Sequence, residues 1–500
     1  MGLSPAPTSL YYLAWVALVP LWIATVREKY RENILIMALL WGFGYHGTAL
    51  FWITGIHPMT WMGVPWLASL AIAVFCWLFI TCWGTAIVLL WCTGMFYLGK
   101  ELPAAARIFL GVAFWCILEA LWSHTPLWWS TVAYTQSPHN LPILQLGQFS
   151  GFTTITAVII LINGCIAEAF ILGKWKADSN NSKPAHIDSR KLLITSILLL
   201  FSFHLWGLYL YRQPLERVAD QAVNIGIIQG NIPNTIKLYP EGFKRAIDGY
   251  TKGYRLLARR EADIVLTPET ALPFYWPDIV AQGSFYGAIL QEKVPAWVGA
   301  FGREGKSYTN SLFTVDGKGK VMSRYDKVKL VPLGEYIPFE PILGRFIDRL
   351  SPLDAHLIAG QSGQIVHTPF GIVTVGICYE SAYPEHFRGQ TLAGGELIIT
   401  ASNNAHYSRA MPAQHHAQDV MRAIENDRWM ARATNTGYSA FVNPRGDTIW
   451  ISGINTYELH QERVYRRQTK TLYVRWGDWL TKSLSLGVVM ILLGYKKTLT

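Results

Sequence analysis

Long apolar segments in the first 211 residues restrict what this chain can fold into more than any other feature. A helix needs about 20 apolar residues to cross the hydrocarbon core of a bilayer. Stretches of about this character span roughly 9–26, 33–55, 64–92, 105–123, 152–174 and 192–211, and a shorter one spans about 481–494. We therefore predict a bundle of about six transmembrane helices over 1–211. A last transmembrane helix and a short cytoplasmic tail are predicted over 481–500.

Basic residues alternate between the loops that join these segments. The second and fourth loops, 56–63 and 124–151, contain no Lys or Arg. The first, third and fifth loops carry Arg27, Lys29, Arg31, Lys100, Lys174, Lys176, Lys183, Arg190 and Lys191, and Arg107 lies just beyond the third loop. Since cytoplasmic loops are enriched in Lys and Arg, the alternation predicts a multi-pass protein of the bacterial inner membrane, with residues 212–480 on the periplasmic side. No basic region precedes the first apolar run, so no cleaved signal peptide is expected.

The charge composition supports the same division of the chain. Only 15% of the residues are charged, against about a quarter in soluble domains, and the deficit lies in the first 211 residues. The net charge is +10, but no run of basic residues forms a patch, so no nucleic-acid partner is expected. The sequence therefore predicts a membrane-embedded protein with one large extracytoplasmic domain over 212–480.

This domain alternates predicted strands with predicted helices. Short β-rich runs occur at 224–228, 263–266, 296–301, 372–377, 396–400 and 439–443, and helical spacing at 241–261, 278–292 and 411–430. Asp316-Gly317-Lys318-Gly319 predicts a hairpin between 311–315 and 320–325. Such alternation is typical of a layered α/β domain.

Three residues that can do chemistry each follow a predicted strand. Glu269 follows Ile264–Leu266, Lys327 follows Val321–Tyr325, and Cys378 follows Ile372–Ile377. Functional side chains collect at strand ends because a rigid scaffold presents them at one edge. A thiol is a strong nucleophile only as thiolate. Glu269 can take its proton, and Lys327 can stabilise the thiolate and an oxyanion.

The distribution of cysteines agrees with a reactive thiol. Cys76, Cys82, Cys92, Cys116 and Cys165 lie in the apolar segments, where Cys acts as a small apolar residue. Cys378 is alone in the 212–480 domain and so cannot be half of an internal disulfide there. No His/Cys cluster has metal-ligand spacing, so neither a metal nor a cofactor is expected.

Several short motifs resemble the nitrilase superfamily. They are Thr267-Pro268-Glu269, Tyr325-Asp326-Lys327 through Leu333-Gly334-Glu335, and Ile377-Cys378-Tyr379-Glu380, in the order Glu, Lys, Cys. Within the superfamily, the chain resembles the apolipoprotein N-acyltransferase family. That resemblance adds the membrane bundle, the single following helix, Gln229-Gly230-Asn231-Ile232-Pro233, and Arg432-Ala433-Thr434-Asn435-Thr436-Gly437.

The resemblance implies an αββα sandwich inserted in a polytopic helical membrane bundle. It also implies that Cys378 attacks the sn-1 ester of a phospholipid and forms a thioester, with Glu269 as base and Lys327 as oxyanion stabiliser. The acyl chain would then pass to the α-amino group of the diacylglyceryl-cysteine of an apolipoprotein. Residues implied to assist or bind substrate are Glu335, Tyr379, Glu380 and Asn310. A monomer is expected.

The sequence departs from the family pattern at a few positions around the expected pocket. The family usually has Trp where Leu238 stands and commonly Trp where Thr267 stands. The run Asn404-Ala405-His406-Tyr407-Ser408 replaces Asp-Ala-Trp-Phe-Gly. These differences affect the prediction of lipid and acceptor choice more than that of acyl transfer. The family also has one more membrane helix before the segment that Leu3-Ser4-Pro5-Ala6-Pro7 resembles.

Three other functions are compatible with parts of this pattern. A membrane-tethered carbon–nitrogen hydrolase of the nitrilase type would use the same residues, with water resolving the thioester. An idle lipid- or lipoprotein-binding homologue would have no reason to keep a lone thiol beside Glu and Lys. A transporter is disfavoured because the apolar segments show no internal repeat and the 212–480 domain is large.

Overall fold

The computed structural model describes residues 1–178, 188–305, 307–332, 334–336, 357–405 and 407–499. These residues form two compact units. The helical unit comprises Met1–Thr54, Ala73–Gln213 and Trp476–Thr500, and the sheet unit comprises Gly55–Ile72 and Pro214–Arg475. The chain passes from one unit to the other near residues 213 and 475, and Gly55–Ile72 groups with the sheet unit.

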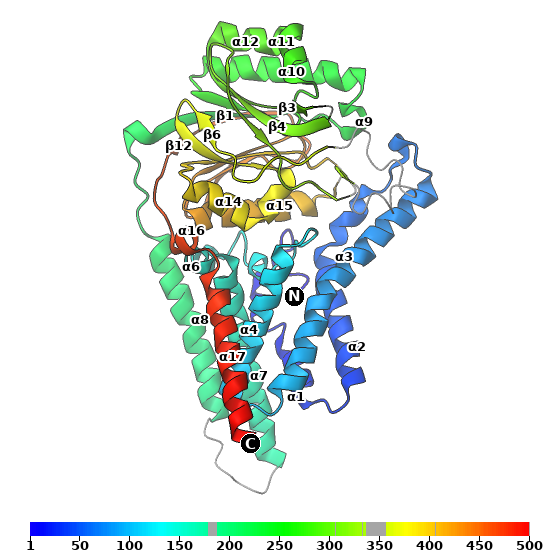
Figure 1. Ribbon diagram of the computed structural model, residues 1–500, viewed down its shortest axis with the longest axis vertical. Coiled ribbons are helices and arrows are strands. Elements are labelled where there is room, and N and C mark those ends of the chain that lie inside the picture. The colour runs from blue at the N-terminus through cyan, green and yellow to red at the C-terminus, as the bar shows by residue number, and fades with distance from the viewer. Residues whose placement is uncertain (179–187, 306, 333, 337–356, 406, 500) are drawn as a thin grey trace. The chain divides into compact units, whose positions relative to one another are not determined.

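The helical unit is built mainly from α-helices (Figure 1). Short 3-10 and π segments join them. Helices long and apolar enough to cross a membrane span Trp66–Gly99, Ala104–Ser123, Phe152–Gly173 and Ser189–Tyr211. The α-helices that lie wholly or mostly in this unit are α1 (Val19–Arg27), α2 (Arg31–Gly42), α3 (Trp66–Gly94), α4 (Ala104–Ser123), α5 (Leu141–Leu144), α6 (Gly147–Ser150), α7 (Phe152–Asp178), α8 (Ser189–Tyr211) and α17 (Trp479–Leu499). The short segments are η1 (Tyr11–Trp15), η2 (Phe43–Gly47), η3 (Phe51–Ile56), η5 (Met95–Gly99) and η6 (Val132–Thr135).

The first two predicted spans are interrupted helices. The segment expected at 9–26 is divided into η1 and α1, and Pro20 stands at the start of α1, where proline is tolerated because its N–H is not needed. The segment expected at 33–55 runs as α2, η2 and η3. Gly42, Gly44 and Gly47 lower helix propensity here.

Buried charges hold the helical unit together. Arg107 of α4 pairs with Glu168 of α7 through two hydrogen bonds of 2.7 and 2.6 Å, and the Trp22 indole donates to Glu168 at 2.9 Å. A Cβ at Gly111 would overlap the Trp22 ring, so this glycine lets α4 approach the ring. Charges at such depth are tolerated when they are paired.

Glu119 of α4 is a second buried carboxylate of the helical unit. It is 1% exposed and accepts hydrogen bonds of 2.8 Å from the Val132 main-chain N–H and the Thr156 hydroxyl. Glu119 therefore anchors η6 and α7 to α4.

The sheet unit contains two six-stranded sheets in the part of the chain that the structure describes. The first has the order β12-β1-β2-β3-β4-β5 and the second β11-β10-β9-β8-β7-β6. Strands of the first sheet are β1 (Ala222–Gln229), β2 (Ile264–Leu266), β3 (Ala296–Glu304), β4 (Ser307–Val315), β5 (Val321–Asp326) and β12 (Glu458–Tyr465). Strands of the second are β6 (Val366–Thr368), β7 (Gly371–Ile377), β8 (Ile398–Ser402), β9 (Met430–Thr434), β10 (Ala440–Val442) and β11 (Thr448–Ile451).

Helices cover the outer faces of the two sheets, which gives the predicted αββα order of layers (Figure 1). One side carries α10 (Pro240–Arg259), α11 (Trp276–Gln282) and α12 (Ser284–Glu292), and the other α14 (Pro384–Leu392) and α15 (Ala410–Asn426). The remaining short elements are η4 (Thr60–Met62), η7 (Ala219–Gln221), α9 (Asn234–Lys237), η8 (Cys378–Ala382) and α16 (Leu472–Trp476).

Alternate strand residues divide between two cores. Ile225 and Ile227 of β1 point between the sheets with Val375 and Ile377 of β7, whereas Ile228 packs against the helices that cover the first sheet. This period of two is the geometry of a strand with both faces covered. The buried strands end at the edge where the predicted site residues lie.

Candidate active site

Glu269 lies just beyond β2, as its position after a predicted strand indicated. The turn Thr267-Pro268-Glu269 packs closely on β3, because a Cβ at Gly299 would overlap the Pro268 carbonyl oxygen. Thr270 has a positive φ of 48°, which is rare for a β-branched residue. Glu269 is 7% exposed. The turn thus holds a carboxylate in a buried, strained loop.

Lys327 follows β5 and lies between two carboxylates. Its side chain is 1% exposed. The ammonium group donates to Glu269 Oε1 at 3.0 Å and to Glu335 Oε1 at 2.9 Å. Its main-chain N–H donates to the Asn310 carbonyl at 2.8 Å, which extends the β4–β5 pairing by one step. Of the three N–H groups of an ammonium, these contacts leave one for another acceptor.

Asn310 and Glu335 complete the group around Lys327. Asn310 Nδ2 donates to Glu269 Oε1 at 2.7 Å and to Glu335 Oε1 at 3.1 Å. Glu335 Oε2 accepts the Val331 main-chain N–H at 2.8 Å. The structure therefore brings four of the predicted residues into one hydrogen-bonded cluster, and Asn310 and Glu335 orient the other two.

Cys378 follows β7 at the start of η8, with φ of 51°. It is 7% exposed. The thiol donates to the Asn403 carbonyl at a distance of 3.8 Å, and its own carbonyl accepts from His415 Nε2 at 2.8 Å. Left-handed backbone in a residue other than Gly stores strain and is frequent at active sites. The sharp turn presents the sulfur at the end of the strand.

The charges of the cluster define its resting protonation state. Burial raises the pKa of Cys378 to about 12, and Glu269 adds to this while Lys327 opposes it. Burial opposes ionisation of Glu269, but the charges of Lys327 and Lys237, together with the hydrogen bonds from Lys327 and Asn310, outweigh it and lower its pKa. Burial likewise opposes the charge on Lys327, and Glu269 with Glu335 raises its pKa well above the usual value. The resting cluster holds a neutral thiol, a carboxylate base and a cation.

Glu380 is placed differently from the other predicted residues. It is fully buried, and its carboxylate accepts from the Ile377 N–H and the Tyr325 hydroxyl. It also accepts the N–H groups of Val328 and Lys329 at 2.7 and 3.0 Å. The structure makes Glu380 a link between the ends of β5 and β7, next to Lys327 and Cys378.

Tyr379 lies directly after the thiol. It is 8% exposed, and its ring packs edge-on against Tyr383 with centroids 5.2 Å apart. The aromatic pair lies on η8 and the turn after it. These contacts show that Tyr379 packs against its neighbour, and its assisting role stays a prediction.

Two residues near the cluster were not singled out as site residues by the sequence. His415 is buried on α15, where its Nε2 bonds the Cys378 carbonyl. Lys237 of α9 is 6% exposed, and its ammonium donates to the Glu269 main-chain carbonyl at 3.0 Å. The one sequence feature that could have indicated Lys237 is its position four residues after the Gln229–Pro233 motif.

The positions that depart from the family pattern are only partly described. Thr267 Oγ1 bonds to the Trp297 carbonyl and accepts the Gly299 N–H, so this threonine supports the β2–β3 pairing. Leu238 is the residue after α9. His406 lies outside the described residues.

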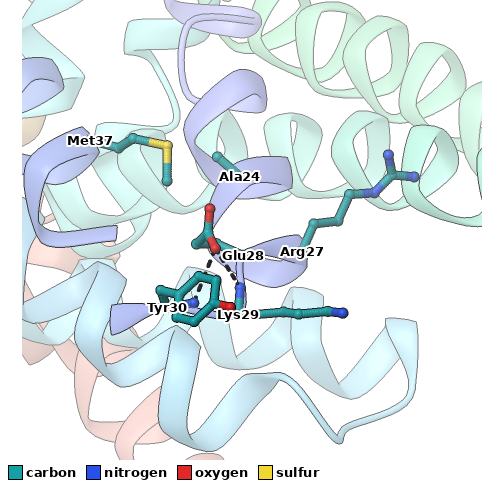
Figure 2. Close-up of a pocket in the computed structure, with 6 residues that line it drawn as sticks. All are labelled: Ala24, Arg27, Glu28, Lys29, Tyr30 and Met37. Carbon is teal, nitrogen blue, oxygen red and sulfur yellow. Dashed lines mark hydrogen bonds between the residues drawn. The ribbon is translucent and has the colours of Figure 1, made fainter. Parts of the chain in front are cut away.

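A surface hollow of about 350 Å³ lies elsewhere, where α1 turns into α2. Figure 2 shows its lining residues Ala24, Arg27, Glu28, Lys29, Tyr30 and Met37. Glu28 Oε1 accepts the N–H groups of Lys29 and Tyr30 at 2.7 and 3.0 Å. None of the predicted site residues lines this hollow, so it has no part in the candidate site. Among the described residues, no group of three His, Cys, Asp or Glu is arranged to hold a metal ion.

Comparisons with known proteins match both parts of the chain. The carbon–nitrogen hydrolase family matches residues 224–467, and the apolipoprotein N-acyltransferase N-terminal domain matches residues 1–165. A protein of Nostoc sp. named apolipoprotein N-acyltransferase is 55% identical over 485 residues, which cover 96% of this chain and 94% of that protein. The chain belongs to the apolipoprotein N-acyltransferase family.

A second member of the apolipoprotein N-acyltransferase family, from Synechocystis sp., is 50% identical over 501 residues, 96% of each chain. Among solved structures, an amidase from Nesterenkonia sp. is 19% identical with a TM-score of 0.39, covering 52% of this chain and 94% of that one. The predicted fold and family are confirmed. The chemical roles of the site residues stay predictions.

Proposed function

We propose that this protein transfers a fatty acyl chain from a phospholipid to the α-amino group of the diacylglyceryl-cysteine of an apolipoprotein. The observation that carries the proposal is the buried group of Glu269, Lys327 and Cys378 at the strand ends. It occurs in a chain with helices apolar and long enough to cross a membrane. A site for two lipid substrates needs both features.

In the first half-reaction, the Cys378 sulfur attacks the ester carbonyl carbon of the phospholipid as its proton moves to Glu269. The remaining N–H of Lys327 donates to the oxyanion that forms. When the tetrahedral intermediate collapses, the C–O bond breaks and Glu269 returns the proton to the leaving lysophospholipid oxygen. The products are a Cys378 thioester and a lysophospholipid.

In the second half-reaction, the unprotonated amine of the acceptor attacks the thioester carbonyl carbon. The C–N bond forms, the C–S bond breaks, and Glu269 carries a proton from nitrogen to sulfur. The covalent intermediate allows two bulky lipids to use one site in turn. Asn310 and Glu335 keep Glu269 and Lys327 aligned, and Glu380 with Tyr379 supports the turn at Cys378.

The cellular setting is part of the same proposal. The alternation of basic loops supports a multi-pass protein of the bacterial inner membrane with the sheet unit on the periplasmic side. Both lipid substrates are then available in the outer leaflet. We also propose that the protein acts as a monomer, with Glu269, Lys327 and Cys378 supplied by the same chain.

The test is intact-mass measurement after incubation with phospholipid alone, for the native chain and for Cys378→Ala. We expect a gain of one fatty acyl chain that hydroxylamine removes and that the variant lacks. A diacylated lipopeptide should then discharge the adduct and gain the acyl chain.

Two results would contradict the proposal. Release of free fatty acid at an equal rate with and without lipopeptide would indicate a hydrolase, in which water resolves the thioester. No adduct with any phospholipid tested, in protein whose Cys378 still reacts with iodoacetamide, would indicate a lipid- or lipoprotein-binding protein.

A further inference from the structure

The cluster around Cys378 contains a second lysine that the acyl-transfer scheme above does not use. Lys237 is the last residue of α9 and is 6% exposed. Its ammonium group donates to the main-chain carbonyl oxygen of Glu269 at 3.0 Å. A buried ammonium is unfavourable unless it is paired with negative charge or its donors are satisfied. Its position therefore needs an electrostatic reason.

The net charge of the cluster explains why a second buried cation is favourable. Lys327 is shared between Glu269 and Glu335, at 3.0 Å and 2.8 Å. One cation between two carboxylates leaves a net charge of −1 beside a thiol that must lose its proton. Uncompensated buried charge is strongly disfavoured. With Lys237 charged, the two lysines and two carboxylates sum to zero before the reaction starts, and also when the proton has moved from sulfur to Glu269.

The backbone around Lys237 is held in place. The preceding loop is fixed by Asn435, whose carbonyl accepts the Asn231 N–H at 2.7 Å and whose side chain bonds both the N–H and the C=O of Ile232. Asn231 has φ of 51°, so the loop is a defined turn. Lys237 thus projects from a short helix that follows a braced loop, unlike a surface lysine that can move into solvent.

The pKa of Lys237 depends on the charges of Glu269 and Cys378, which supports the same role in charge balance. Burial lowers its pKa to about 8, and Glu269 and Cys378 counter this shift. Lys237 therefore remains mainly charged at neutral pH, and its charge acts on both members of the proton-transfer pair.

We propose that Lys237 is the charge-balancing residue of the acyl-transfer site: it offsets the second carboxylate, so that Cys378 can pass its proton to Glu269 without net negative charge in the buried cluster. The inference rests on the proposed use of Cys378 as nucleophile. Lys237 acts through Glu269 and Cys378, and is a positioning residue.

The test is the rate at which iodoacetamide alkylates Cys378, followed by mass spectrometry of the Cys378 peptide across pH 7 to 10. The variants are Lys237→Gln, Lys237→Met and Lys237→Arg. Gln can keep the hydrogen bond to the Glu269 carbonyl without the charge, and Arg keeps the charge. Lys244→Gln is the matched control, since Lys244 is exposed on α10.

We expect Gln and Met to slow alkylation at pH 7 about tenfold, because loss of a nearby cation raises a thiol pKa by about one unit or more. Arg should restore most of the native rate, and the Lys244 control should not differ from the native protein. The native rate in the Gln variant would overturn the proposal, because the hydrogen bond alone would then suffice. Equal loss in Arg and Met would overturn it as well.

This measurement uses no lipid and is therefore independent of the proposed reaction. If the native chain forms no acyl adduct while Lys237→Gln still slows alkylation, acyl transfer fails as a function and the charge-balancing role stands. If the adduct forms and alkylation is unchanged in Lys237→Gln, acyl transfer stands as the function and the charge-balancing role of Lys237 fails.

Discussion

Each unit of the molecule contains a buried ion cluster, and the two differ in how completely they are closed. In the helical unit, Arg107 and Glu168 form a one-to-one pair with two hydrogen bonds. Trp22 donates to the same carboxylate. The remaining guanidinium nitrogen donates to the main-chain carbonyl oxygens of Gly99, Lys100 and Leu102.

The cluster of the sheet unit is open by comparison. Lys327 serves two carboxylates, Glu269 and Glu335, and these hydrogen bonds take two of its three N–H groups. A neutral thiol and a strained turn at Cys378 lie beside it. The difference teaches that equal burial of charge can serve two purposes. A closed pair stabilises packing, and an open cluster keeps charge available for a reaction.

Replacing the central cation should break this comparison most strongly. In Lys327→Met, two buried carboxylates lose their partner, and the oxyanion loses its donor. We expect acyl-enzyme formation to fall about 10²–10³-fold, as for loss of one oxyanion donor, and stability to fall by about 3–5 kcal/mol. The rate of the mass gain and the unfolding midpoint measure the two effects. A rate within threefold of native would remove Lys327 from the reaction.

Changing the support of the nucleophile should have a smaller effect. His415→Leu removes the donor to the Cys378 carbonyl, and we expect acyl-enzyme formation to slow about tenfold, the value of one hydrogen bond. His415→Gln, which offers a comparable N–H, should keep most of the rate. Similar rates for Leu and the native protein would show that the turn at Cys378 is stable without His415.

The same variants test a dependence of stability on pH. Burial lowers the pKa of His415 well below its ordinary value of 6.5, and Arg432 adds to this. The unfolded chain therefore binds the proton more readily, and the stabilisation is present above pH 6.5 and is lost as pH falls below it. The native protein should lose up to about 1.4 kcal/mol per pH unit more than His415→Leu between pH 6 and pH 5. Parallel unfolding curves for the two proteins would contradict this.

Opening the closed pair should leave the chemistry almost unchanged. In Arg107→Met, Glu168 is left buried without its cation, so we expect a loss of about 3–5 kcal/mol. The double variant Arg107→Met/Glu168→Met should recover part of this loss. In protein that remains folded, the pH dependence of Cys378 alkylation should match the native one. A displaced profile would show that the two clusters are coupled.

The sequence predicted those site residues whose role depends on local position. Glu269, Lys327 and Cys378 each follow a strand, and a strand end can be recognised from an apolar run and the residue after it. Glu380 was expected to assist, but its link between β5 and β7 depends on contacts 52 and 55 residues away in the chain. A link between residues so far apart in the chain cannot be predicted from the local sequence.

The same limit applies to the elements of the fold. A helix was expected over 411–430, but α15 ends at Asn426, where Asp427 takes a left-handed conformation with φ of 52°. Met430–Thr434 is then the buried strand β9, which pairs parallel with β8 and antiparallel with β10. Its residues continue an apolar pattern that fits either a helix or a buried strand. The neighbouring strands decide between the two.

The carboxylate of Glu380 binds both sheets, through Tyr325 of β5 and Ile377 of β7. One side chain therefore spans the distance between the ends of β5 and β7, in addition to the apolar residues packed between the sheets. Shortening that side chain by one methylene, as in Glu380→Asp, would change the spacing of the two strand ends that precede Lys327 and Cys378. Glu380 thus acts as a spacer of fixed length between two parts of the site.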